Sequence, residues 1–207
     1  KGYAFAEYQQ TEPYLSGIAH PSIPAVSVQD GFERAAGQSI LPEGTFPRFA
    51  NMNRFDLVND PGKGSVLKVT GETSNGFACE PHIAVEDLDL QLEFKLSPGS
   101  EFSCVVSEPA KGQATDIFLL ETTAASNGCS VNDKPVCSLA ANVWYGFRLT
   151  YQSASSGWHA EIYRPSDNQP VWEGTVPAYA DAAAQIDMIC FFAGGNGKAP
   201  IFLDNLV

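Results

Sequence analysis

The sequence predicts an all-β protein, built as a two-sheet antiparallel β-sandwich. Apolar and polar residues alternate with a period of two along many short stretches, clusters of Pro, Gly, Asn and Ser separate these stretches, and helical periodicity is nearly absent. A length of 207 residues is compatible with one sandwich domain. We therefore expect a single β-sandwich over residues 25–207 and an extended, proline-interrupted segment over residues 1–24.

The clearest strand pattern lies at residues 87–96, where leucines and a phenylalanine alternate with charged and amide side chains. The run 143–151 repeats this alternation, and a Ser/Gly-rich turn joins it to the run 158–164, which is typical of a hairpin. Further strands are expected near residues 48–57, 65–70, 102–107, 116–122, 171–176, 186–192 and 201–207.

The polar sides of the three clearest runs would line one open surface if these strands share a sheet. This surface carries the candidate ligand-binding residues Gln91, Glu93, Arg148, His159, Glu161 and Tyr163. Carboxylates beside an arginine or a histidine could perform acid–base chemistry. The alternative is a solvated sheet face, on which each cross-strand charge pair contributes at most about 1 kcal/mol.

Aromatic residues add a second reason to consider this surface, because flat rings stack against the apolar side of a sugar. Tyr163, Trp158 and Trp172 could stack in this way. Core packing is the alternative for Trp158, and it is the expectation for Trp144.

Acidic residues lie within the first and last apolar runs of the predicted sandwich. The run 201–207 carries Asp204, and the run 26–33 carries Asp30 and Glu33. We expect these runs to pair as first and last strands, so that oxygen atoms of Asp30, Glu33 and Asp204 could meet around a calcium ion. The alternative is that the polar pair at positions 204 and 205 accepts hydrogen bonds from a neighbouring loop.

The spacing of two cysteines suggests a crosslink. Cys129 and Cys137 flank the turn-forming sequence Asn132-Asp133-Lys134-Pro135, and this spacing suits a disulfide across a hairpin. Two ordinary buried thiols are the alternative. The chain has five cysteines, so at least one stays unpaired within a monomer, and the absence of a CxxC pair argues against a zinc site.

Composition and charge exclude several classes of protein. Hydrophobic residues make up 44% of the chain and charged residues only 17%, which indicates a folded protein, and the apolar runs are too interrupted to span a membrane. With 12 basic and 24 acidic residues, the net charge is −12. This charge repels phosphate backbones and anionic membranes, so nucleic acid is not an expected partner. Nothing in the sequence predicts the oligomeric state.

Several stretches match a known pattern: Asp30-Gly-Phe-Glu33, Gly64 to Thr70, Asn142 to Thr150, Trp158 to Tyr163, and Ile201 to Val207. Together they resemble the concanavalin A-like (laminin-G-like) jelly-roll domains of secreted bacterial carbohydrate-active proteins. The resemblance implies a jelly-roll sandwich, a secreted or cell-surface location, and calcium in a structural role. Galactose-binding-like jelly rolls are the rival fold, because they also carry Phe-Glu near the start and an Asp-containing final strand.

The expected function is non-catalytic recognition of a carbohydrate. The catalytic patterns of family 16 glucanases and of alginate lyases, which share the resembled fold, are absent from this sequence, as are Gly-x-Ser-x-Gly and His-Glu-x-x-His. The second possibility is a polysaccharide-degrading hydrolase or lyase built around Glu93, Arg148 and Glu161. The third is an adhesion or assembly module that binds protein.

Overall fold

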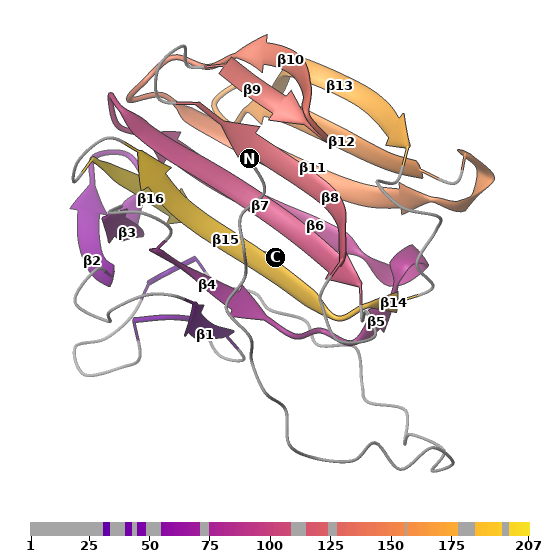
Figure 1. The fold of residues 1–207 in the computed structure, drawn as a ribbon. Helices are drawn as coiled ribbons and strands as arrows, with labels where there is room; N and C mark the ends of the chain where they lie inside the picture. Colours follow the sequence, from indigo (N-terminus) through magenta and orange to yellow (C-terminus); the bar gives the residue numbers. More distant parts are fainter. Residues whose placement is uncertain are drawn as a thin grey trace.

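The described residues form two seven-stranded antiparallel sheets packed face to face and a small two-stranded sheet at one end (Figure 1). The structure is a computed structural model, and it describes residues 31–33, 40–42, 45–48, 55–70, 75–108, 115–123, 128–155, 157–177, 185–195 and 199–207. The predicted all-β jelly-roll sandwich is confirmed. Residues 1–30 lie outside the described residues, so the expected extended segment over 1–24 and its boundary stay predictions.

Sheet I has the strand order β1-β4-β15-β7-β8-β9-β10. Its strands are β1 (Thr45–Arg48), β4 (Asn75–Cys79), β7 (Ser100–Glu108), β8 (Thr115–Thr122), β9 (Gly128–Val131), β10 (Lys134–Ser138) and β15 (Met188–Gly195). The small sheet pairs β5 (Ile83–Ala84) with β14 (Gln185–Ile186).

Sheet II has the strand order β13-β12-β11-β6-β16-β3-β2. Its strands are β2 (Phe55–Asp60), β3 (Gly64–Thr70), β6 (Asp89–Leu96), β11 (Trp144–Gln152), β12 (Gly157–Arg164), β13 (Gln169–Pro177) and β16 (Pro200–Asp204). The helical elements of the described residues are the 3₁₀ turns η2 (Val85–Asp87) and η3 (Ser153–Ser155). Within this part of the chain, no helix has the length and apolar character that crossing a bilayer requires.

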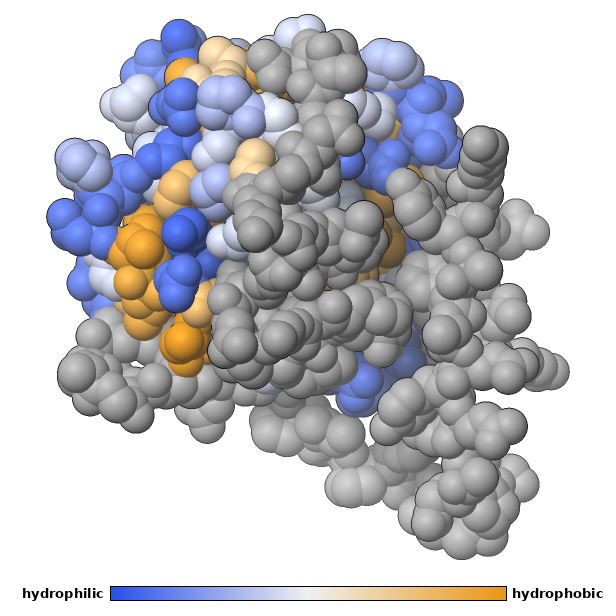
Figure 2. Space-filling model, turned by 60° about the vertical axis from the view of Figure 1, so that its left-hand side comes forward, coloured by the Kyte–Doolittle hydropathy of each residue, from blue (hydrophilic) through white to orange (hydrophobic). Residues whose placement is uncertain are grey.

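The core lies between the two sheets and consists of the apolar side chains that alternate along each strand. Phe94 of β6 stacks on Phe102 of β7, with ring centroids 5.0 Å apart. Trp158 of β12 is fully buried, and its indole N–H donates to the backbone carbonyl of Ile117 on β8 over 3.0 Å. Because this bond joins the two sheets, Trp158 belongs to the core and is not available to stack on a ligand. On the face of the molecule shown in Figure 2, clusters of hydrophobic residues lie beside hydrophilic ones.

The start of the described chain lies near its end, but not as a paired strand. β16 is hydrogen-bonded to β3 on one side and to β6 on the other, and residues 31–33 form no strand. The prediction that the run ending at Glu33 pairs with the last strand is therefore wrong for these three residues, because β3 and β6 occupy both edges of β16. A β-carbon built on Gly31 would nevertheless lie 3.7 Å from Asn205 Oδ1, so the two ends are neighbours.

Candidate functional site on the outer face of sheet II

Strand pairing gathers the predicted ligand-binding residues on one surface. β6, β11 and β12 are adjacent in sheet II, and their residues align in rows across the strands. One row runs Gln91, Arg148, Glu161, and the next runs Glu93, Gly146, Tyr163. We call the outward surface of these strands the polar face, defined by the six sequence-predicted candidates that the structure brings together there: Gln91, Glu93, Arg148, His159, Glu161 and Tyr163.

Arg148 lies at the centre of the polar face and contacts each neighbouring strand. Its Nε donates to Gln91 Oε1 over 3.4 Å, and its Nη1 donates to Glu161 Oε2 over 3.3 Å. Its guanidinium carbon lies 4.3 Å from the centroid of the Tyr163 ring. The Arg148 side chain remains 42% exposed. Since a guanidinium has five N–H donors, this arrangement fixes its plane and leaves donors for a ligand.

Tyr163 is only 6% exposed although it lies outside the interior core. The ring covers Gly146 on the neighbouring strand, where an added β-carbon would lie 2.1 Å from Tyr163 Cζ. Only glycine leaves room for the ring at that position. Burial raises the pKa of Tyr163, with Arg148 opposing this effect and the carboxylates of Glu93 and Glu161 adding to it. The phenol therefore keeps its proton and its donor capacity.

His159 lies on the same face, one row beyond Arg148 and opposite Thr150. Its Nε2 is 3.4 Å from Glu173 Oε1 on β13, and the imidazole is 31% exposed. The structure therefore extends the row that contains Glu161 to β13 and adds Glu173, which is 57% exposed. Glu173 could be found from the sequence only by pairing β12 with β13, which places it opposite Glu161.

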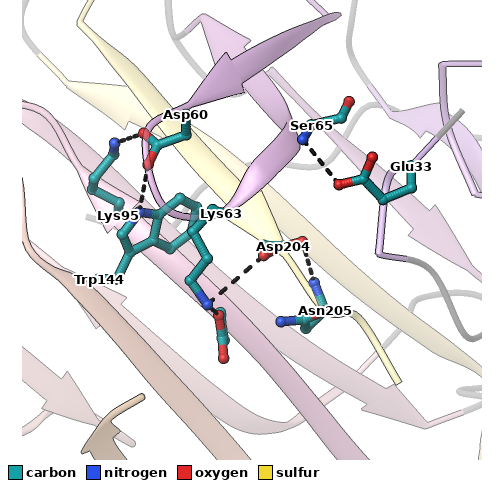
Figure 3. A network of polar contacts seen from close by, with 9 residues as sticks. Glu33, Asp60, Lys63, Ser65, Lys95, Trp144, Asp204 and Asn205 are labelled. Carbon is teal, nitrogen blue, oxygen red and sulfur yellow. Dashed lines mark hydrogen bonds and ion pairs between the residues drawn. The ribbon is translucent and has the colours of Figure 1, made fainter. Parts of the chain in front are cut away.

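A second group of side chains borders the polar face on the side of β16 and β3 (Figure 3). Lys63 lies in the turn between β2 and β3, contacts Glu93 Oε2 and lies 3.8 Å from Asp204 Oδ2. Its ammonium is 5.4 Å from the centroid of a Trp144 ring. Sequence reasoning missed Lys63, because its role depends on which strands flank the turn.

Lys95 of β6 lies between two aromatic rings on this side. Its ammonium is 5.1 Å from the centroid of Trp144 and 4.6 Å from that of Phe202. Asp60 accepts hydrogen bonds from Lys95 Nζ and, over 3.1 Å, from the indole N–H of Trp144 (Figure 3). Burial opposes the charge on Asp60, but these donors outweigh it and lower the pKa of Asp60. The expectation that Trp144 packs in the core is wrong, because alternation along β11 places it on the outer face.

The predicted calcium ligands lie near this second group. Glu33 Oε1 accepts from the Ser65 backbone N–H over 3.1 Å, and Asp204 Oδ1 accepts from the Asn205 N–H over 2.9 Å (Figure 3). Burial raises the pKa of Asp204, with Glu93 and Glu33 adding to this effect and Lys63 and the Asn205 N–H opposing it. Glu33 is thus close enough to act on Asp204 electrostatically.

The described side chains alone do not complete a calcium site. Calcium takes six to eight oxygen ligands, whereas within this part of the chain no group of three or more His, Cys, Asp or Glu side chains could hold a metal ion. Lys63 supplies a positive charge to Asp204 instead. Asp30 lies outside the described residues, so calcium binding stays a prediction.

Comparisons with known proteins concern the arrangement of strands. No family model matches the sequence, and no curated protein matches it either. Among solved structures, the chain is similar to a Lotus tetragonolobus seed lectin, with a TM-score of 0.49 and 8% identity over 78% of this chain and 90% of the lectin. It is also similar to lectin II from Ulex europaeus, with a TM-score of 0.47 and 12% identity over 80% and 94% of the two chains. A sialidase matches with a TM-score of 0.49 and 13% identity over 75% of this chain, which spans only 17% of the sialidase.

Proposed function

We propose that the polar face binds a carbohydrate without cleaving it. The observation that carries this proposal is the position of Arg148, held between Gln91, Glu161 and the Tyr163 ring on three adjacent strands while its side chain stays 42% exposed. The resemblance of the sequence to jelly-roll domains of carbohydrate-active proteins supports the same function.

The chemistry of the polar face suits sugar hydroxyl groups. A hydroxyl both donates and accepts hydrogen bonds, so a surface that offers guanidinium donors beside amide and carboxylate acceptors can satisfy neighbouring hydroxyls of one ring. Strands hold Gln91, Arg148 and Glu161 in register, and the contacts between them restrict their rotamers before a ligand arrives. Such preorganisation reduces the entropy that binding would otherwise cost.

A binding experiment with matched variants tests the proposal. Glycan-array screening identifies a ligand, and isothermal titration calorimetry then compares the wild type with Arg148→Ala and Glu161→Gln. Loss of a hydrogen bond to a charged group costs about 1.5–3 kcal/mol, so each variant should bind roughly ten- to a hundredfold more weakly. Arg164→Ala is the control, because Arg164 is an exposed arginine at the end of β12 that pairs with Asp167 and is not one of the polar-face residues. Equal affinities for the wild type and both polar-face variants would refute the proposal.

One observation favours glycoside cleavage as the second candidate function. Glu93 and Glu161 face the same side of β6 and β12, which are separated only by β11, but they lie in neighbouring rows, so their Cα atoms are about 10 Å apart across the sheet and about 12 Å apart in all. Inverting hydrolysis of a glycosidic bond uses two carboxyl groups about 6.5–9.5 Å apart, a separation that these side chains would reach by leaning towards each other. Both glutamates form ion pairs, with Lys63 and Arg148 respectively, and such pairs equally suit a binding surface. Release of reducing ends that disappears in Glu93→Gln would establish the enzyme, and binding without release would establish recognition.

We also propose a secreted or cell-surface location, which the resemblance to secreted proteins supports. Fractionation of the source cells, with the protein detected outside the cytoplasmic membrane, tests this. If the protein binds a protein of the cell surface and gives no signal on the glycan array, the adhesion or assembly function replaces carbohydrate recognition.

A further inference from the structure

Cys129 and Cys137 face each other across the hairpin that forms one edge of sheet I. The hairpin consists of β9 and β10, joined by a two-residue turn at Asn132 and Asp133. Both turn residues have positive φ angles, 46° and 62°, which is the conformation of the tight turns that match the twist of paired strands. No disulfide joins any of the five cysteines, all of which lie within the described residues.

A β-bulge brings the two sulfur atoms opposite each other. Counting back from the turn, Lys134 pairs with Val131 and Pro135 with Ser130, so regular pairing would place Val136 opposite Cys129. The register shifts by one residue after Pro135, and Cys137 becomes the partner of Cys129. A bulge inserts one residue and re-aims the side chains beyond it. The irregularity therefore has a definite result, which is the alignment of two thiols.

The spacing and burial of the pair suit a crosslink. Directly opposed residues of an antiparallel pair have Cα atoms about 4.5–5.5 Å apart, and disulfides span about 4.4–6.8 Å. Cys129 is 2% exposed within the core, whereas Cys137 is half-buried and packs against the core from the edge strand. The Cys129 thiol donates to Cys137 Sγ, and this hydrogen bond lowers the pKa of Cys137. Cys137 is thus the more accessible of the two sulfurs and the better nucleophile.

We propose that Cys129 and Cys137 form a reversible cross-strand disulfide by exchange with a low-molecular-weight disulfide such as oxidised glutathione. The Cys137 thiolate attacks one sulfur of the oxidant, which forms a mixed disulfide and releases one thiol. The Cys129 thiolate then attacks Cys137 Sγ, closes the protein disulfide and releases the second thiol. The protein loses two hydrogens and the oxidant gains them.

The disulfide would fix an element that ties the two sheets together. Asn132, at the tip of the hairpin, accepts from the Leu119 backbone N–H of β8 in sheet I over 2.9 Å. Its Nδ2 donates to the Pro177 carbonyl at the end of β13 in sheet II over 2.9 Å. Figure 1 shows β9 and β10 beside β12 and β13 at this end of the sandwich. Oxidation at the base of the hairpin would therefore hold the turn against both sheets.

Thiol counting combined with peptide mapping tests the proposal on the intact chain. After incubation with oxidised glutathione, the number of alkylatable thiols in the unfolded protein should fall from five to three. Digestion should then yield the peptides of Cys129 and Cys137 linked to each other. The crosslink lowers the entropy of the unfolded chain even though the loop is short, so the melting temperature should rise by roughly 5–10 °C. Reduction of the disulfide should bring it back to the original value.

Variants separate this pair from the other cysteines. Cys137→Ser should abolish both the loss of two thiols and the reversible rise in melting temperature, while Cys104→Ala, a fully buried core position, should lose two thiols like the wild type. If a variant does not fold, the peptide map of the wild type alone decides. Cys129 and Cys137 recovered as separately alkylated peptides after oxidation, or linked to other cysteines, would overturn the proposal.

Discussion

The contact between Gly146 and Tyr163 gives the sharpest test of the geometry of the polar face. In Gly146→Ala, the new methyl carbon would lie 2.1 Å from Tyr163 Cζ. Carbon atoms in contact lie about 3.5–4.0 Å apart, so the ring has to move by about 1.5 Å. Because the ring also stacks under the Arg148 guanidinium, 4.3 Å away, this movement disturbs the centre of the proposed site.

The magnitude follows from three effects. Overpacking costs about 1–3 kcal/mol, and weakening of the Arg148–Tyr163 stack costs about 0.5–1 kcal/mol. The lower entropy of alanine in the unfolded chain offsets about 0.4–1 kcal/mol of this loss. We therefore expect a net destabilisation of about 2 kcal/mol, which lowers the melting temperature of a chain of this size by roughly 4–8 °C.

Urea denaturation provides the assay, with Gly31→Ala as the control. A β-carbon on Gly31 makes only an ordinary contact of 3.7 Å, so this variant should be as stable as the wild type or more stable by about 0.4–1 kcal/mol. The decisive measurement is a double-mutant cycle. In the background of Tyr163→Ala, where the ring is absent, Gly146→Ala should cost almost nothing. Additive effects of the two substitutions, or a Gly146→Ala variant as stable as the wild type, would refute the reasoning.

Three further predictions concern charged groups. Asp60→Asn leaves the Lys95 ammonium without its carboxylate and should cost about 2–4 kcal/mol of unfolding free energy. Because the pKa of Asp60 is lowered, this loss of stability should shrink as the pH falls below about 4 towards that pKa. A loss of stability that does not change with pH would contradict the prediction. Burial raises the pKa of Asp116, so its charge costs stability above that pKa, and Asp116→Asn, which keeps an acceptor for Ser107, should melt above the wild type at neutral pH. This difference should vanish in a calorimetric pH series below about pH 4, and a gain that persists there would have another cause. If calcium binds as the sequence predicts, a calcium concentration a hundredfold above its Kd should stabilise the protein by about 2.7 kcal/mol. Calcium should not change the melting temperature of Asp204→Asn. Identical melting temperatures of the wild type with chelator and with calcium would contradict the prediction.

Alternation predicted the strands because it reports a local property, the face on which each side chain lies. The run 87–96 alternates in the sequence, and β6 alternates between buried residues and residues that are exposed or half-buried in the structure. Partner strands were less predictable, since pairing depends on residues far away in the chain. The run 201–207 has a strand pattern, but nothing in it specifies that β3 and β6 are its neighbours.

The candidate site was predictable to the same extent. The six polar-face residues could be chosen because each lies on the polar side of a clear alternation. Lys63 could not be chosen, because a lysine in a turn becomes part of a site only when sheet order places Glu93 and Asp204 beside it. The burial of Tyr163 was equally hidden, since it depends on the missing side chain of Gly146 on the adjacent strand.

The central position of β16 in sheet II has a consequence for how a growing chain acquires this fold. β16 follows every other strand of sheet II along the sequence, and roughly 130 residues separate Thr70 from its partner Pro200. Until β16 leaves the ribosome, the hairpin of β2 and β3 has no neighbour in its sheet, and β6 presents an open edge. Unpaired edges of this kind are sites of misassociation in nascent polypeptides. Completion of sheet II therefore waits for β16, and its two halves carry unpaired edges until that strand emerges.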